Sequence, residues 1–242
     1  MKLADQTTDH RISSQPVYQK RTCNESAGAA LIKFLRHARH ASGFHNWETK
    51  NYETWLLLQN LLYITRPRTL VEFGSGRSTG YLAEYAFKYG AKLFSFEQHL
   101  YYFLRVRLGL VFSFLPAHYV KYVPIKDGWY DVRRVERHLA AVGDIEFFFY
   151  DGPTTENSGR RSSEKFYQYV VPLLNKVRMV IVDDVHRPDE ERVAHFLAQK
   201  FRLKRFNITS TSTNTLAIML AEPYADRVHD LPVFLKDLLN AA

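Results

Sequence analysis

The stretch LVEFGSGRSTGYLAEY, residues 70–85, joins a short apolar run to an amphipathic pattern through a turn rich in glycine and hydroxyl side chains. The apolar run is typical of a buried strand, and the spacing after it predicts a helix that begins near Ser78. Gly74 and Gly76 allow the backbone to turn tightly and to approach a ligand closely, while the start of the helix presents free N–H groups. Such a turn favours a nucleotide-like cofactor, although glycine between a strand and a helix can also serve sterics alone.

The alternation of strand and helix continues along the chain. Short apolar runs lie at about 69–73, 92–97, 119–125, 145–150, 178–182 and 215–220, and helical patterns lie at about 78–90, 99–112, 132–141, 161–176 and 189–201. Continuous apolar strands that alternate with helices indicate a mostly parallel sheet with helices on both faces. The sequence therefore predicts a doubly wound α/β fold.

The region before the first strand has a different character. Residues 1–26 are polar, and helical patterns follow at 27–40 and at about 47–65, the second of which stops before Pro67. We expect residues 1–66 to form an arm and an N-terminal helical extension packed on the core, and residues 67–242 to form the α/β domain. A chain of 242 residues, 46% of them hydrophobic, is of ordinary size for one such domain.

Composition limits the classes of protein. Cys23 is the only cysteine, so no disulfide framework is expected. The sequence shows neither the apolar core of a signal peptide nor the roughly 20 apolar residues of a membrane span, which predicts a cytoplasmic protein. The net charge of +8 is spread over short basic clusters, so a solvated basic surface is favoured over a nucleic-acid partner.

Two carboxylates near the glycine turn indicate the kind of cofactor. Glu97 ends the second apolar run, where doubly wound folds bind the two hydroxyls of a ribose. Dinucleotide-binding turns follow the spacing G-x-G-x-x-G, whereas the turn from Gly74 to Gly80 is one residue longer. Glu72, beside the turn, would repel a pyrophosphate and attract a cation. A positively charged cofactor with a ribose, such as S-adenosylmethionine, is therefore favoured over NAD or NADP.

The motif VEFGSGRSTG followed by FSFEQ resembles the first two motifs of the class I S-adenosylmethionine-dependent methyltransferases, and the resemblance covers roughly residues 68–221. It implies a seven-stranded sheet, with Glu72 near the amino group of the cofactor and Glu97 on its ribose. Asp127, in VPIKDGWYD, would contact the adenine, although an Asp-Gly turn is an equally good interpretation. The candidate cofactor-binding residues are Glu72, Gly74, Ser75, Gly76, Ser78, Glu97 and Asp127.

Three more carboxylates follow later strands. Asp151 ends IEFFFYD, and Asp183 and Asp184 follow VRMVIV, so all three are expected at the same edge of the sheet. Clustered carboxylates repel one another unless they are protonated or bridged by a cation, and oxygen ligands suit Mg²⁺ or another hard divalent cation. The pattern is similar to the catechol-type O-methyltransferases, which hold a metal with an aspartate after the fourth strand and an Asp-Asn pair after the fifth. Helix and loop capping is the alternative role.

The candidate catalytic residues are Asp151 and His186. Catechol-type enzymes carry a lysine base three positions after the first metal aspartate, and this chain has Thr154 there. His186, just beyond the aspartate pair, is the nearest substitute, because its pKa suits proton transfer near neutrality. A solvated histidine without a catalytic role is the alternative.

The acceptor is predicted from the same strand ends. DGPT differs from the Asp/Asn-Pro-Pro-aromatic motif that holds a flipped base, and DGP, DDVHRPDE and DGWYD resemble a methyltransferase branch found with glycan or surface-polymer synthesis. Arg160 and Arg161 could bind an acidic sugar or a phosphate. We therefore expect metal-assisted O-methylation of a carbohydrate or other small polyhydroxylated molecule. The alternatives are a non-catalytic cofactor- or RNA-binding scaffold and an NAD(P)-dependent oxidoreductase.

The segment HLYYFLRVRLGLVFSFLPAHY, residues 99–119, is more apolar than a surface helix of this fold usually is. We expect it to be buried, with packing on the N-terminal helices. A homodimer face and peripheral contact with a membrane are the alternatives.

Overall fold

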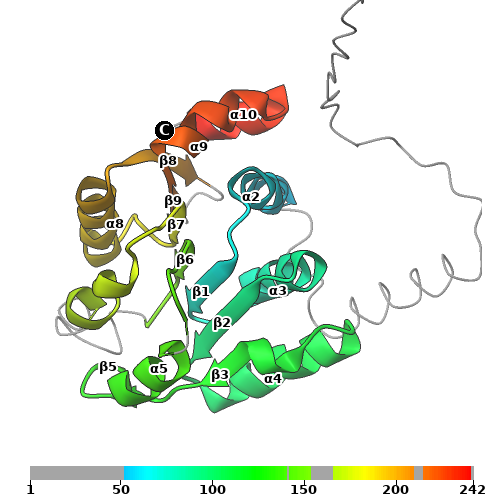
Figure 1. The fold of residues 1–242 in the computed structure, drawn as a ribbon, viewed down its shortest axis with the longest axis vertical. Helices are drawn as coiled ribbons and strands as arrows, with labels where there is room; N and C mark the ends of the chain where they lie inside the picture. Colours follow the sequence, from blue (N-terminus) through cyan, green and yellow to red (C-terminus); the bar gives the residue numbers. More distant parts are fainter. Residues whose placement is uncertain (1–51, 141, 154–165, 210–214, 241–242) are drawn as a thin grey trace, which may run out of the picture.

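The computed structural model describes residues 52–140, 142–153, 166–209 and 215–240. Its centre is a seven-stranded sheet with the strand order β3-β2-β1-β6-β7-β9-β8 (Figure 1). The strands of this sheet are β1 Thr69–Phe73, β2 Lys92–Glu97, β3 Val120–Tyr122, β6 Phe147–Tyr150, β7 Met179–Val182, β8 Leu203–Thr209 and β9 Thr215–Ala221. The first five are parallel, and β9 is antiparallel to both β7 and β8. The predicted doubly wound, mostly parallel α/β fold is confirmed.

Helices cover both faces of the sheet, as Figure 1 shows. They are α2 Tyr52–Thr65, α3 Arg77–Tyr89, α4 Leu100–Phe112, α5 Val132–Leu139, α8 Pro188–Phe201, α9 Glu222–Ala225 and α10 Val233–Asn240, with short 3-10 helices at Ala117–Tyr119, Val171–Leu173 and Asp226–Asp230. Side chains alternate along a strand, so neighbours in β1 enter different layers. Leu70 belongs to a buried cluster with side chains of α2, α3, α4 and α10, whereas Val71 belongs to a second cluster with side chains of α5 and α8.

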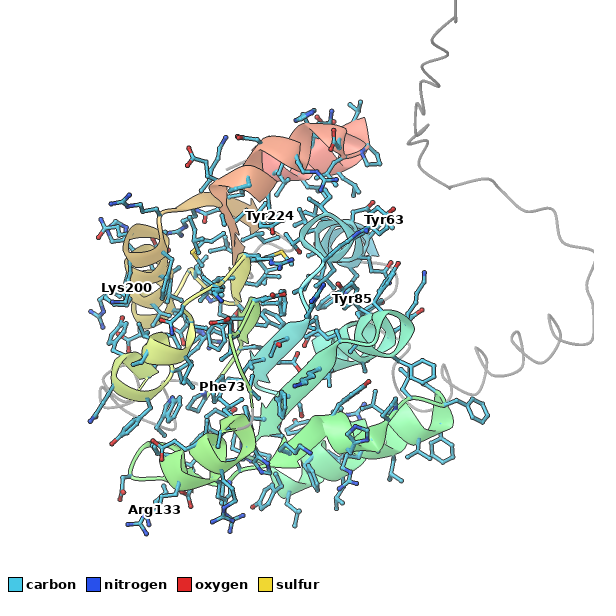
Figure 2. The ribbon with its side chains drawn as sticks, in the orientation of Figure 1. Tyr63, Phe73, Tyr85, Arg133, Lys200 and Tyr224 are labelled. Atoms are coloured by element: carbon cyan, nitrogen blue, oxygen red, sulfur yellow. The ribbon has the colours of Figure 1, made fainter. Side chains whose placement is uncertain are left out.

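Phe73, the last residue of β1, packs in an aromatic cluster near the carboxyl edge of the sheet. Phe73 is completely buried, and its ring centroid lies between 5.1 and 5.8 Å from those of Phe96, Trp129, Tyr130 and Phe148. Figure 2 shows Phe73 deep in the fold, while Arg133 and Lys200 lie at its surface. Because these rings come from four strands, they hold the strand ends in a fixed arrangement.

Two strand features differ from the sequence predictions. β8 was not expected, because Lys204 and Arg205 interrupt its apolar residues, yet it pairs with β9 along its whole length. The run at 119–125 was expected to be one strand, but β3 ends at Tyr122. The chain then forms a separate hairpin of β4 Ile125–Lys126 and β5 Trp129–Tyr130, which sequence periodicity did not reveal.

The helical predictions also need correction. The prediction at 161–176 falls partly on residues outside the described part. Within that part the α-helix covers only 166–169, and Pro172 lies in the 3-10 helix that follows, because proline cannot continue an α-helix hydrogen-bond ladder. The C-terminal helices α9 and α10 were not predicted. The pattern at 27–40 lies outside the described residues.

The helix that precedes β1 belongs to the packed core. Leu57, Leu61 and Leu62 of α2 are completely buried, and the Trp55 ring stacks on Tyr81 of α3 with centroids 5.0 Å apart. The division of the chain at residue 66 stays a prediction. In the described part of the chain, no helix is both long and apolar enough to cross a membrane.

Within the described residues, only one side of the 99–119 segment is buried, whereas burial of the segment was expected; its expected packing on the helical pattern at 27–40 lies outside the described residues. Val106 and Leu110 of α4 are buried, but most other apolar side chains of this helix have at least half of their surface exposed.

Candidate functional site

The turn after β1 is fixed by backbone contacts with two neighbouring segments. Gly74 has a φ of 90°, and its N–H donates to the carbonyl oxygen of Phe96 at 2.9 Å. A Cβ at position 74 would lie 2.4 Å from the carbonyl oxygen of Asp151, so only glycine fits without a backbone shift. Gly74 therefore has a steric role, and it brings the ends of β1, β2 and β6 together.

Gly76 differs from Gly74, because a Cβ there would meet no atom within 4 Å. It directly precedes α3, and its N–H donates to the Thr79 hydroxyl at 2.9 Å. The space beside Gly76 thus lies next to the first turn of a helix, where free N–H groups and the helix dipole favour a negatively charged ligand group.

Glu72 is completely buried and accepts hydrogen bonds from three hydroxyl groups. Ser78 donates to Oε1 at 2.5 Å, and Thr79 and Ser95 donate to Oε2 at 2.6 and 2.5 Å. Burial raises the pKa of Glu72 from its ordinary 4.5 to about 7, although the three hydroxyls partly oppose this effect. The carboxyl group thus anchors the start of α3 to β2. Contacts of Glu72 and Ser78 with a cofactor stay predictions.

Glu97, at the end of β2, faces the same turn. Its Oε2 accepts hydrogen bonds from the backbone N–H and the hydroxyl of Ser75 at 3.0 and 2.9 Å, and its Oε1 accepts one from the N–H of His99 at 2.7 Å. Burial raises the pKa of Glu97. The structure therefore joins two of the predicted cofactor-binding residues directly.

The hairpin of β4 and β5 contributes a residue that sequence analysis missed. Tyr130 is completely buried, and its hydroxyl donates to Oε1 of Gln98 at 2.5 Å. A Cβ on Gly152 would lie 3.4 Å from the Tyr130 oxygen, so this side chain links the ends of β2 and β6. The aromatic pair in DGWYD was the available signal. Asp127 has a φ of 53° and lies exposed in the hairpin turn, and its contact with an adenine stays a prediction.

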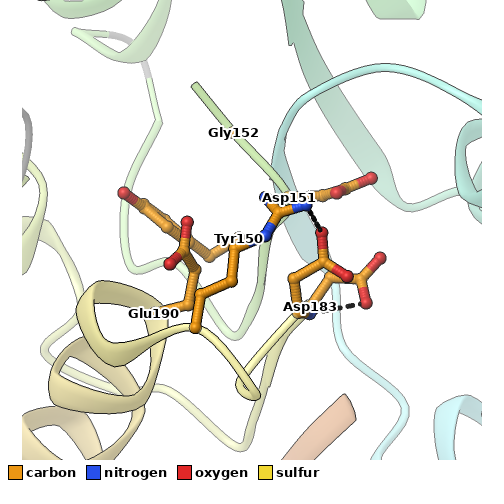
Figure 3. Close-up of a pocket in the computed structure, with 7 residues that line it drawn as sticks. Tyr150, Asp151, Gly152, Asp183 and Glu190 are labelled. Atoms are coloured by element: carbon orange, nitrogen blue, oxygen red, sulfur yellow. Dashed lines mark hydrogen bonds and ion pairs between the residues drawn. The ribbon is translucent and has the colours of Figure 1, made fainter. Parts of the chain in front are cut away.

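Asp151 and Asp183 follow the neighbouring strands β6 and β7 and line one pocket (Figure 3). The N–H of Asp151 donates to the carbonyl oxygen of Phe73 at 2.8 Å, and that of Asp183 to Tyr150 at 2.9 Å. Burial, and after it the Asp183 carboxylate, raises the pKa of Asp151 well above its ordinary value. Burial and the charge of Asp184 raise the pKa of Asp183 to about 6. The structure thus brings two proton-accepting groups to one place.

Asp184 lines the same pocket but is paired with a cation from its own turn. Its Oδ2 lies 2.9 Å from the guanidinium of Arg187, which also lines the pocket. His186 is 40% exposed, and its Nδ1 lies 3.9 Å from Oδ1 of Asp184. His186 therefore faces Asp184 from the solvent side, and its catalytic role stays a prediction.

The predicted metal ligands Asp151, Asp183 and Asp184 line one pocket. Their oxygens have the right chemistry for a hard cation. However, in the described ranges no group of three His, Cys, Asp or Glu side chains has the arrangement needed to hold a metal ion. The Arg187 guanidinium supplies positive charge at Asp184 instead. The metal-binding role of the three aspartates therefore stays a prediction, and no chemical step is assigned to a metal.

Glu190 is a fourth carboxylate of the pocket that sequence analysis missed. It comes from the first turn of α8 and is only 5% exposed, and its Oε2 has no hydrogen-bond partner in the described part of the chain. Burial raises its pKa. Acidic residues commonly begin helices, so nothing in PDEER distinguished Glu190 from its neighbours. Thr154, Arg160 and Arg161 lie outside the described residues.

Comparisons with known proteins agree on the fold. No protein-family model and no curated protein matches the sequence. Among solved structures, the O-methyltransferase TomG from Streptomyces achromogenes, involved in tomaymycin synthesis and in complex with SAM, has a TM-score of 0.53 at 16% identity, covering 83% of this chain and 92% of that one. Cofactor-bound Rv0187 from MTB has a TM-score of 0.52 at 17% identity, with 79% and 89% covered. SAH-bound PaMTH1 from Podospora anserina has a TM-score of 0.50 at 11% identity, with 83% and 97% covered.

The strand order, with a final antiparallel pair, and these structural neighbours define one class of fold. It is the fold of the class I S-adenosylmethionine-dependent methyltransferases, as the motifs around Gly74 and Glu97 predicted.

Proposed function

We propose that the protein is a S-adenosylmethionine-dependent O-methyltransferase that acts on a hydroxyl of a carbohydrate or other small polyhydroxylated molecule. The observation that carries this proposal is the turn between β1 and α3. A buried carboxylate, Glu97, contacts Ser75 there, and open space lies beside Gly76. TomG, which shares the fold, has been solved with SAM. The choice of a polyhydroxylated acceptor rests on the sequence motifs.

The cofactor is oriented by the chain's own groups. Glu97 would accept hydrogen bonds from the ribose hydroxyls, because a buried carboxylate is a strong acceptor at this position of a doubly wound fold. The N-terminus of α3 would hold the carboxylate of the methionine part, which its N–H groups and dipole would stabilise. Glu72 acts through position, since it holds Ser78 and Thr79 at the start of the same helix.

Asp151 is the group that receives the acceptor proton. Its raised pKa, caused first by burial, makes it a stronger base than an ordinary aspartate. Bound S-adenosylmethionine would supply its methyl group to the acceptor oxygen and leave as S-adenosylhomocysteine, and Asp151 would take the proton that the acceptor hydroxyl loses. Positioning of the two reactants supplies the larger part of the rate increase.

The first experiment is calorimetric titration with S-adenosylhomocysteine, NAD and NADP. We expect binding of S-adenosylhomocysteine alone. Binding of NAD or NADP alone would identify an oxidoreductase and overturn the proposal. RNA binding that falls with salt, without methyl transfer to any acceptor, would instead support the scaffold alternative.

The acceptor is then sought by measuring the formation of S-adenosylhomocysteine with a panel of monosaccharides, acidic sugars and polyols. Asp151→Asn is expected to reduce transfer by about 100-fold or more and to leave S-adenosylhomocysteine affinity within about threefold. His186→Ala tests the second predicted base in the same assay. A larger loss for His186→Ala than for Asp151→Asn would reverse the assignment of the base.

A further inference from the structure

One side of α4 is an exposed apolar stripe. Its members have between 50% and 73% of their surface exposed, and together with Phe114, two residues after the end of the helix, they are defined here as the α4 face: Leu100, Tyr101, Leu104, Leu108, Val111, Phe112 and Phe114. At about 100° per residue, the helical members span roughly 120° of the helix surface. The buried stripe, which contains Val106 and Leu110, lies on the opposite side.

No other described element covers this stripe. α4 packs against α3, β2, β3 and the 3-10 helix at Ala117–Tyr119, and Figure 1 shows it at the outer edge of the molecule. A helix that is apolar nearly all round is usually buried, and a contiguous exposed apolar patch usually marks an interaction site. The α4 face is therefore a candidate interaction surface.

The charges around the α4 face indicate which partner. Helical spacing places Arg105 on one border of the stripe and Arg107 on the other, and both are exposed. No aspartate or glutamate occurs from residue 98 to residue 126, a stretch that also contains Lys121 and Lys126. The guanidinium carbon of Arg107 lies over the Phe103 ring, 5.1 Å from its centroid.

We propose that the α4 face binds the surface of a bilayer that contains anionic lipids. Leucine and aromatic side chains enter the region between headgroups and acyl chains, while arginines at the border contact lipid phosphates, as in interfacial amphipathic helices. A second copy fits less well, because a symmetric contact would bring the bordering arginines of both copies together with no acidic residue nearby on this segment.

The start of α4 lies close to the candidate cofactor site. α4 begins directly after His99, whose N–H donates to Glu97. A bilayer at the α4 face therefore lies next to the cofactor edge of the sheet, where it would present an acceptor attached to a lipid. This consequence rests on the proposed function, whereas membrane binding itself does not.

The test is flotation of the full chain with two kinds of vesicle, without cofactor. One contains phosphatidylcholine alone and the other equal parts of phosphatidylcholine and phosphatidylglycerol. We expect binding to the mixed vesicles that weakens as salt is raised, and at least about 10-fold weaker binding to the neutral ones. Failure of the folded chain to bind mixed vesicles would overturn the proposal, and it would leave the cofactor titration unaffected.

Substitutions on α4 test whether the α4 face is the part of the protein that binds the vesicles. Leu104→Glu/Leu108→Glu is expected to abolish flotation, and Arg105→Gln/Arg107→Gln to weaken it about 10- to 30-fold. Val233→Glu is the matched control, because Val233 is a 71% exposed apolar residue on α10. Equal losses for Val233→Glu would refute the assignment to α4. So would a stable dimer that Leu108→Glu dissociates in sedimentation velocity, since a second copy would then occupy the face.

Discussion

The backbone of Gly74 lies directly against the backbone of Asp151. A Cβ on Gly74 would come within 2.4 Å of the Asp151 carbonyl oxygen and 2.8 Å of its carbonyl carbon. The first glycine of the cofactor turn is thus required by the protein's own chain, and it locks the expected cofactor loop to the strand end that carries the expected base. The position of the glycine turn after β1 therefore depends on the position of the β6 end that carries Asp151.

Gly74→Ala is expected to lower the free energy of unfolding by about 3 kcal/mol or more, because a positive φ and a backbone clash both oppose the new side chain. Urea denaturation measures the loss. Gly90→Ala is the control, since Gly90 has a φ of 66° and a Cβ there would meet no atom within 4 Å. A loss no greater than that of Gly90→Ala would show that the contact with Asp151 is not tight.

Gly76→Ala is expected to leave stability nearly unchanged and to weaken cofactor binding. Its Cβ would enter open space, so the free energy of unfolding should change by less than about 1 kcal/mol. If the cofactor occupies this space, affinity for S-adenosylhomocysteine should fall by about 10-fold or more, measured by calorimetry. Unchanged affinity in this variant would place the cofactor away from Gly76.

The sequence was sufficient to predict the features that depend on local chemistry. Apolar runs alternating with helical patterns predicted the parallel core of the sheet, and the glycines and Glu97 marked its carboxyl edge. β8 was missed because its partner, β9, supplies the hydrogen bonds that its mixed composition does not suggest. The Arg187–Asp184 pair was missed because the turn that contains it, with a φ of 56° at Asp184, carries no signal in the sequence. Burial of α4 was expected from composition, which does not reveal the direction of its side chains.

Glu97→Ala is expected to weaken cofactor binding by about 10- to 100-fold, since hydrogen bonds to a charged group contribute roughly 1.5–3 kcal/mol each. Ser75→Ala separates the two roles of Glu97. It removes the hydroxyl that donates to Oε2 but keeps the carboxylate and the backbone hydrogen bond of Ser75. Calorimetry should therefore give a smaller loss for Ser75→Ala, and equal losses would mean that Glu97 acts only by holding the turn.

Glu72 should make stability depend on pH. Its pKa is about 7 in the folded protein and 4.5 ordinarily, so folding favours the protonated form. The contribution is fully present below about pH 4.5 and is lost as the pH rises through about 7, with a total of about 3 kcal/mol. Glu72→Gln removes the charge. The free energy of unfolding of this variant, relative to that of the parent, should therefore rise between about pH 5 and pH 8. Glu84→Gln, an exposed change on α3, is the control and should show no such trend. If the stabilities of Glu72→Gln and the parent depend on pH in the same way, Glu72 is not the source of the pH dependence.

Arg187→Ala should increase the affinity of the acidic pocket for Mg²⁺ or Mn²⁺. The guanidinium lies 2.9 Å from Oδ2 of Asp184 and thus competes with any other cation for that carboxylate. Its removal leaves Asp151, Asp183, Asp184 and Glu190 around one pocket with no balancing charge from this side chain. We expect about 10-fold tighter binding by calorimetric titration of the metal. Arg192→Ala is the matched control. Arg192 pairs with Asp189 within α8, and neither residue lines the pocket. Unchanged or weaker metal binding by Arg187→Ala would show that Arg187 does not take the place of a cation at Asp184.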